Sequence, residues 1–277
     1  MNGRGYPHDV PVNGAIIAVE AWHHYLHSRR PETLVKARDI LAATLDNVAD
    51  HLDLAASPLR FKAAPLMTFS ETMVAEDPSE ARVACRAVAS GHLAALSAAG
   101  VAPSAHGTDA LATRILTELT LPRHPDGGYR IGAKEDPEYL RCPSVILGSF
   151  PLYQLPADTS LARTFERELA RIVFLFAWLP HQASVVASQL ARSEGPGSGH
   201  ALLRSADPFY KPWHAYHEWE NRRSVRAATF VTGAGGFCLA LHAQLLAETA
   251  LGEWSLYPGA PADWTDLTFD HLHTRAG

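Results

Sequence analysis

Hydrophobic positions recur along most of the chain with the period of an amphipathic helix. In the segment "ETLVKARDILAATLDNVADHL" (residues 32–52), apolar side chains return every three or four positions. Pro31 precedes this segment, at a point where the first helical turn tolerates proline. The same spacing predicts further helices over residues 77–100, 159–179, 181–192 and 235–252.

The helix expected at residues 77–100 carries signals for both of its ends. Asp77 is placed to cap the helix, Pro78 to occupy its first position, and Glu80 follows three residues after the cap. Gly100 is expected to end the helix, because glycine adopts the backbone conformation that commonly follows a last turn.

Turn-forming residues separate the helical segments, as in "LPRHPDGGYR", "GAKEDPEY" and "SEGPGSG". Only short runs such as "ATFVT" and "WSLYP" are typical of extended chain. The regular alternation of strands and helices that marks a parallel sheet is missing from the pattern. The sequence therefore predicts an all-α fold, with residues 1–277 forming one domain of paired helices.

Composition and charge exclude several classes of partner. The net charge is −5 and no cluster of Lys and Arg is present, which argues against a nucleic-acid-binding surface. The longest apolar run, "IVFLFAWL", is far shorter than the roughly 20 residues of a membrane-spanning helix. The opening "MNGRGYPHDV" lacks the apolar stretch of a signal peptide, so we expect a cytoplasmic protein with no membrane partner.

Histidines and cysteines raise the question of a metal. The three cysteines are far apart in the sequence and show no close-spaced zinc pattern. His214 and His217 lie three residues apart, followed by Glu218 and Glu220. This spacing is not the HExxH pattern of zinc enzymes, and no third ligand is indicated elsewhere. We therefore expect no metal.

The glycine-rich stretch "TGAGGF" invites comparison with a phosphate-binding turn. A dinucleotide-binding fingerprint needs a third glycine where this chain has Cys238, and no lysine of the Walker type follows. We expect Gly233, Gly235 and Gly236 to form a tight turn that lets a helix start close to its neighbour. No nucleotide or other cofactor is expected.

Two glutamates have surroundings that suit acid–base chemistry. Glu71 lies among apolar residues just before a predicted helix, and such neighbours raise the pKa of a carboxyl group as a general acid requires. Glu218 lies between Tyr216 and Trp219, in a segment rich in flat aromatic side chains. Hydrolysis of a glycosidic bond commonly uses one protonated and one ionised carboxyl group.

The order of these motifs resembles the C-terminal half of the catalytic (α/α)6 barrel of glycoside hydrolase family 65. The resemblance is carried by "TFSETMVAEDPSEARVACRAVASGHLAAL", "YKPWHAYHEWE" and above all "FVTGAGGFCLAL", and it runs from about Gly5 to Trp264. It implies a partial (α/α)6 barrel that lacks the family's N-terminal β-sandwich and first barrel helices.

The resemblance also implies a reaction, the hydrolysis of an α-glucosidic bond with inversion. Glu71 would protonate the leaving oxygen, and Glu218 would activate a water molecule, with Glu220 as the second candidate for the base. The substrate would be an α-glucoside or disaccharide. The expected substrate-binding residues are Trp213, Tyr216, Trp219, Arg141 and Asp136.

Two alternatives remain at this stage. One is a disaccharide phosphorylase, although the family's phosphate-binding stretch is represented only by "PHQASVVAS", where His181 and Ser184 remain without two adjacent serines. The other is a catalytically inactive partial barrel or one subunit of a split enzyme. Half a barrel exposes apolar helix faces, so we also expect a homo-oligomer or a partner subunit that completes the barrel.

Overall fold

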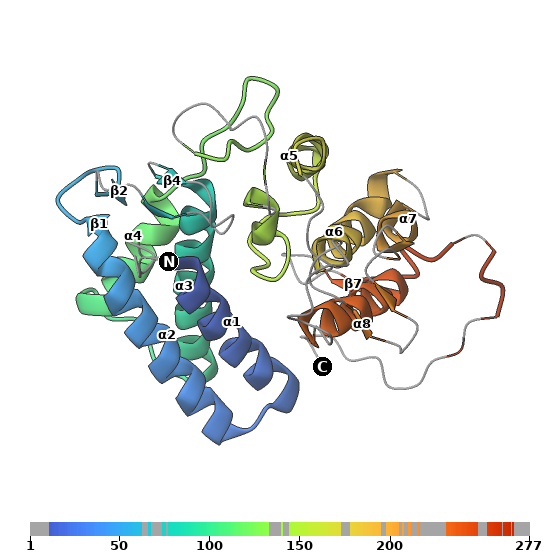
Figure 1. Cartoon of the computed structure of the whole chain (residues 1–277). Coiled ribbons are helices and arrows are strands. Elements are labelled where there is room, and N and C mark those ends of the chain that lie inside the picture. The colour runs from blue at the N-terminus through green and yellow to red at the C-terminus, as the bar shows by residue number, and fades with distance from the viewer. Residues whose placement is uncertain are drawn as a thin grey trace, which may run out of the picture. The chain divides into compact units, whose positions relative to one another are not determined.

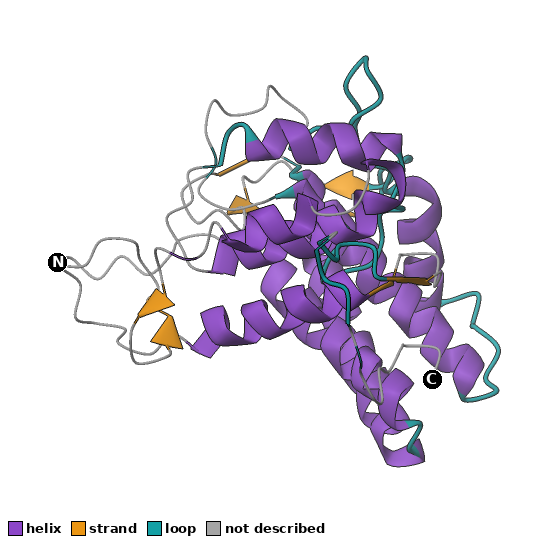
Figure 2. Cartoon of the chain, turned by 90° about the vertical axis from the view of Figure 1, so that its right-hand side faces the viewer, coloured by secondary structure: helices purple, strands orange, loops and turns teal. Residues whose placement is uncertain are grey.

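The computed structural model describes residues 11–62, 66–67, 74–75, 77–132, 140, 144–172, 178–194, 198–204, 207, 210–211, 215–216, 231–248, 254–261, 263–266 and 268. The described chain is predominantly helical (Figures 1 and 2), as the all-α prediction requires. It divides into two compact units, Met1–Pro137 with Pro151–Gln154 and Arg275–Gly277, and Glu138–Phe150 with Leu155–Thr274. The single-domain expectation stays a prediction.

Unit 1 is built on four helices, which run from blue to green in Figure 1: α1 (Pro11–Ser28), α2 (Pro31–His51), α3 (Ser79–Ala98) and α4 (Gly107–Glu118). α1, α2 and α3 contact one another, and α4 packs against α2 and α3. The prediction of a helix beginning at Pro31 is confirmed. Two short antiparallel hairpins follow α2, β1 (Leu52–Asp53) with β2 (Arg60–Phe61), and β3 (Leu66–Met67) with β4 (Val74–Ala75).

The core of unit 1 follows the apolar face of α2. Its fully buried side chains recur with helical spacing at Ala37, Leu41, Leu45 and Val48. Each buried leucine contributes about 1.5–3 kcal/mol relative to leaving it exposed. Gly91 of α3 lets the two helices approach, since an added Cβ would lie 3.1 Å from Leu41 Cδ2.

The ends of α3 confirm one expectation and correct another. Gly100 has a φ of +70° and its N–H bonds to the carbonyl of Ser97, so the predicted terminating glycine is confirmed. The predicted cap is wrong by one residue. Pro78 occupies the cap position, and Asp77 instead has a φ of +54° and forms an ion pair with Arg82. The carboxylate is drawn away from the helix end because the arginine offers it two donors.

A buried histidine joins α3 to α4. His92 is 4% exposed, and its Nε2 lies 2.7 Å from Asp109 Oδ1. Asp109 Oδ2 also accepts a hydrogen bond of 2.8 Å from the backbone N–H of Ser104. The hydrogen bond from the Ser104 N–H has the larger effect and the one with His92 the smaller. Both hold the pKa of Asp109 below its usual range, since they stabilise the ionised carboxylate.

Unit 2 carries the helical segments drawn from green-yellow to red in Figure 1: η1 (Val145–Gly148), α5 (Thr159–Leu169), α6 (Trp178–Glu194), α7 (Ser198–Arg204) and α8 (Val231–Leu245). α6 packs against both α7 and α8, and α7 also contacts α8. A small apolar cluster fills this arrangement, formed by Val185 of α6, Leu203 of α7, and Ala240 and Ala243 of α8.

Strand pairing ends α8 earlier than expected. The helix predicted to reach residue 252 stops at Leu245, because β7 (Leu246–Glu248) pairs antiparallel with β8 (Trp254–Leu256). The extended conformation expected for "WSLYP" is confirmed at β8. A further short pair joins β5 (Tyr210–Lys211) to β6 (Ala215–Tyr216).

The helix predicted over residues 159–179 is also shorter in the structure. Asp158 caps the start of α5, and its Oδ1 accepts from the N–H groups of Ser160 at 2.9 Å and Leu161 at 3.0 Å. The helix ends at Leu169, because the carbonyl of Arg171 instead accepts a hydrogen bond of 2.8 Å from the N–H of Leu140. A contact distant in sequence therefore decides where α5 stops.

The helices differ widely in polarity. α5 contains several charged residues, whereas α8 contains no Asp, Glu, Lys or Arg. Even so, a bilayer crossing would need more length and apolar character than any helix in the described part of the chain possesses.

Candidate functional site

Most of the residues selected from the sequence lie outside the described residues. These are Glu71, Asp136, Arg141, Trp213, His214, His217, Glu218, Trp219 and Glu220. The backbone of Tyr216 is described in β6, where it pairs with Tyr210. The two-carboxylate site and its aromatic walls therefore remain predictions.

Two other sequence stretches on which the resemblance rests contact each other in unit 2. α6 carries His181 and Ser184 of "PHQASVVAS", and α8 carries the glycines of "FVTGAGGFCLAL". The two helices pack together (Figure 1). A Cβ added at Gly236 would lie 2.9 Å from His181 Nδ1 and 3.1 Å from His181 Cβ. The ring of Phe237 meets the His181 ring edge-on, with centroids 6.0 Å apart.

The expected tight turn at these glycines is wrong. Gly233, Gly235 and Gly236 lie inside α8, whose first residue is Val231. Gly236 leaves room for the imidazole of His181, whereas a Cβ at Gly235 would meet nothing within 4 Å. The stretch therefore allows α8 to pack closely against α6, and it does so at Gly236.

α6 is unusual because it buries polar side chains beside apolar ones. The buried polar residues are His181, Gln182, Ser184, Ser188 and Gln189. The hydroxyl of Ser184 donates to the carbonyl of Gly199 at 2.6 Å, and that of Ser188 donates to the carbonyl of Ser184 at 2.9 Å. These bonds offset the cost of burying hydroxyl groups.

Glutamine side chains extend this hydrogen bonding to neighbouring segments. Gln189 Nε2 donates to the carbonyl of Glu248 at 2.8 Å, and Gln182 Nε2 donates to the carbonyl of Phe150 at 3.1 Å. On α8, Gln244 Oε1 lies 3.2 Å from Nδ1 of His200 in α7. We call the buried residues His181, Ser184, Ser188 and Gln244, together with His200, the polar seam. It fixes how α6, α7 and α8 pack.

The environment of His181 determines its charge. The side chain is fully buried, and this burial lowers its pKa to about 4, while a backbone hydrogen bond with Gly233 acts in the opposite direction with the smaller effect. His181 is therefore neutral at neutral pH. It cannot supply the positive charge that would attract a phosphate ion.

This burial has a consequence for stability. The unfolded chain takes up a proton at this histidine near pH 6.5, whereas the folded protein does so only near 4. The unfolded state therefore gains protons first, and we expect the protein to lose up to about 3 kcal/mol of stability as the pH falls through this window. Urea unfolding at pH 7 and pH 4.5, followed by circular dichroism, measures the loss.

The matched variants isolate the contribution of His181. His181→Gln should reduce the fall in unfolding midpoint between the two pH values, because glutamine takes up no proton. His24→Gln, at an exposed position of α1, should leave the fall unchanged. An equal fall in wild type and His181→Gln would contradict the assignment.

Possible metal ligands and a buried cysteine also occur among the described residues. Within the described ranges, no three His, Cys, Asp or Glu side chains gather closely enough to hold a metal ion. Cys85 is buried in α3, and burial raises the pKa of its thiol to about 12, so it is not a thiolate nucleophile at neutral pH.

The polar seam was not anticipated from the sequence. The signal available was the composition of "HQASVVASQ", which holds five polar residues and no carboxylate, lysine or arginine inside a helical segment. Such a stretch is too apolar for a solvated helix face and too polar for a purely apolar core. Its partners could not be read from it, because they lie on α7, α8, the strand after α8 and the segment after η1.

No protein-family model matches the chain, and no curated protein matches it in sequence.

Proposed function

We propose that the chain is a glycoside hydrolase family 65-like protein, part of an (α/α)6 barrel, that hydrolyses an α-glucosidic bond with inversion. The observation that supports this best is the contact between His181 and Gly236. It joins two stretches, "PHQASVVAS" and "FVTGAGGFCLAL", that the resemblance singled out independently. Neighbouring positions in a shared barrel explain why both stretches occur in one chain.

The proposed reaction uses two carboxyl groups. Glu71 protonates the glycosidic oxygen as the bond breaks, and Glu218 takes a proton from the attacking water, with Glu220 as the second candidate for this role. An inverting mechanism requires these carboxyl groups to stand roughly 6.5–9.5 Å apart so that water fits between base and sugar. Trp213, Tyr216, Trp219, Arg141 and Asp136 are proposed to hold the sugar.

The polar seam favours hydrolysis over phosphorolysis. A phosphate ion would need free donors and positive charge where "PHQASVVAS" lies. The hydroxyls of Ser184 and Ser188 instead donate to backbone carbonyls, and both side chains are fully buried. Burial also keeps the pKa of His181 low, so its ring is neutral. Water is therefore the proposed nucleophile.

The second candidate, one subunit of a split enzyme, is favoured by the outer face of α8. Val231 is 75% exposed and Leu239 is 50% exposed, on a helix without Asp, Glu, Lys or Arg. Cys238 lies beside Leu239 and is also exposed. Helices of this composition are usually covered on all sides, so a second chain is a candidate to cover this face.

Glucose release from trehalose, maltose and kojibiose tests the proposal. Wild-type protein should release glucose without added phosphate. We expect Glu71→Gln and Glu218→Gln each to lower the rate by at least about 100-fold, since general acid–base catalysis contributes about 10²–10⁴. Glu32→Gln, at an exposed position of α2, is the matched control and should keep the wild-type rate.

The possible outcomes separate the candidates. Release that requires phosphate would favour the phosphorylase. A folded wild-type protein that releases no glucose alone, but does so when a second chain is added, would favour the split enzyme. Retention of activity in both Gln variants would contradict the two-carboxylate mechanism.

A further inference from the structure

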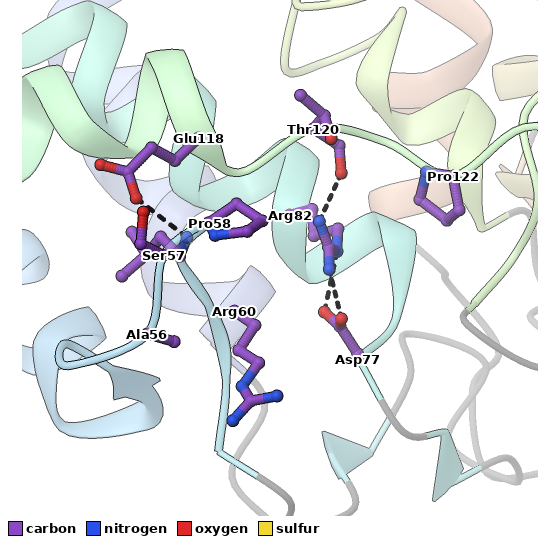
Figure 3. Close-up of a pocket in the computed structure, with 10 residues that line it drawn as sticks. Ala56, Ser57, Pro58, Arg60, Asp77, Arg82, Glu118, Thr120 and Pro122 are labelled. Carbon is purple, nitrogen blue, oxygen red and sulfur yellow. Dashed lines mark hydrogen bonds and ion pairs between the residues drawn. The ribbon is translucent and has the colours of Figure 1, made fainter.

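A cavity of about 520 Å³ lies within unit 1, and the described residues that line it come from three segments of the chain. Figure 3 shows three segments around it. They are the loop before β2 with Ser57 and the first residue of β2, Arg60; the start of α3 with Arg82 and, just before it, Asp77; and the end of α4 with Glu118 and, beyond it, Thr120. Its size falls within the range of about 300–1,000 Å³ that small-molecule sites occupy.

One wall is held in place by Arg82. Its Nε and Nη2 donate to the two carboxylate oxygens of Asp77, and its Nη1 donates to the carbonyl of Thr120. The side chain of Arg82 is only 13% exposed and that of Asp77 is 21% exposed. Arginine has five N–H donors, so two of them stay available after these three bonds.

The opposite wall is held in place by Glu118. Its Oε2 accepts a hydrogen bond of 3.0 Å from the N–H of Leu59, and its two oxygens also bind Arg114 at 2.8 and 3.0 Å. Arg114 in turn donates to the carbonyls of Leu54 and Ala56, each at 3.0 Å. The loop that carries Ser57 and leads into Arg60 of β2 is therefore held against α4 by the protein's own hydrogen bonds.

Arg60 lies at the rim and has guanidinium N–H donors available for a ligand. Its Nε and Nη2 both donate to Asp53 Oδ2, at 3.3 and 3.2 Å, which leaves three of its five N–H groups available. Its side chain is 66% exposed, and Thr120 is also exposed, so solvent reaches this rim of the cavity.

The charges of the described residues around the cavity balance one another. Each arginine is matched by a carboxylate, in the pairs Arg60–Asp53, Arg82–Asp77 and Arg114–Glu118. Among these described side chains, an anion or a cation would therefore find no net charge to compensate its own. What the walls offer instead is a set of fixed, charge-assisted donors and acceptors side by side. Such a wall suits a ligand whose groups both donate and accept without carrying charge.

We propose that this cavity binds a neutral polyhydroxylated molecule, a sugar or polyol of mono- or disaccharide size. Each hydroxyl of such a ligand donates to a carboxylate and accepts from a guanidinium. The described residues that line the cavity include no aromatic side chain, so what they offer a ligand is hydrogen bonds. The proposal goes beyond the proposed reaction, because the residues it is argued from, Arg60, Asp77, Arg82 and Glu118, are not among those that the reaction uses.

Calorimetry and saturation-transfer NMR with trehalose and maltose test the site, using the full chain. Thr120→Trp is the main variant, because it adds bulk at the cavity while Arg82 uses only the backbone carbonyl of Thr120. We expect it to weaken binding by at least about tenfold. Thr117→Trp, exposed on α4 and outside the cavity lining, should bind as wild type does. Arg60→Ala, at the exposed rim, should weaken binding by a smaller factor.

The same titrations in the Glu71→Gln variant keep this test separate from the proposed reaction. Saturable binding that Glu71→Gln retains and Thr120→Trp loses would support the site, even if no glucose is released. Absence of binding of either sugar to folded wild-type protein would overturn it. Binding of inorganic phosphate or free lysine that Thr120→Trp abolishes, and that exceeds sugar binding, would also overturn it.

Discussion

Replacement of Glu168 by alanine is expected to destabilise unit 2 by about 3–5 kcal/mol. Glu168 lies in α5 and is 1% exposed. Its Oε2 accepts from the N–H of Ser144 at 3.0 Å, and its Oε1 accepts from the N–H of Val145 at 2.6 Å. Alanine would leave two buried N–H groups at the start of η1 without these acceptors, at about 1–3 kcal/mol each, and would also remove packing.

Urea unfolding followed by circular dichroism measures this effect against a control in the same helix. Glu166→Ala, at an exposed position of α5, should change stability by less than about 0.5 kcal/mol. Glu168→Gln keeps the volume and one acceptor oxygen, so its loss should be intermediate. If Glu168→Ala lowers the free energy of unfolding by no more than Glu166→Ala does, the carboxylate does not hold η1 against α5.

Adjacent glycines in α8 are expected to respond to alanine in opposite directions. At Gly235 an added Cβ meets nothing within 4 Å, so Gly235→Ala should stabilise the helix by about 0.5–1 kcal/mol. At Gly236 it would lie 3.1 Å from His181 Cβ and 2.9 Å from Nδ1. Neither helix can move without disturbing the polar seam, so Gly236→Ala should destabilise by about 1–2 kcal/mol.

The gap of about 1.5–3 kcal/mol between the two variants is the quantity to measure, by thermal or urea unfolding. The two substitutions change the same atoms in the same helix, so differences in unfolded-chain entropy cancel between them. Equal stabilisation by both would mean that α6 and α8 do not approach each other as closely as the structure has them. A Gly236→Ala protein that is also less active would link the contact to the barrel site.

Local pattern was sufficient for helices that pack on one apolar face. The spacing of Leu41 and Leu45 predicted α2, and Pro31 indicated its start. Gly100 indicated the end of α3, because the conformation after a last helical turn is a property of that residue itself. Such features depend on neighbours three or four positions away and are therefore visible in sequence.

Local pattern failed where a distant segment competes for the backbone. α5 stops at Leu169 because Arg171 bonds to Leu140, and α8 stops at Leu245 because β7 pairs with β8. Asp77 looked like a helix cap but pairs with Arg82. In each case a hydrogen bond that forms only once the chain has folded competes with the local preference for helix. It outweighs that preference, which amounts to a few tenths of a kcal/mol to about 1 kcal/mol.

The candidate sites also divide into features that short segments of sequence determine and features that only distant contacts determine. The sequence by itself determined the helical class, the polar composition of the first turns of α6, and the glycine stretch of α8, since these are properties of short segments. Only the tertiary structure decided that Gly236 and not Gly235 faces His181, that Ser184 is satisfied by Gly199, and which arginine balances each carboxylate around the cavity. Those choices join residues far apart in the chain, and the energy of each contact exists only after packing has brought its two partners together.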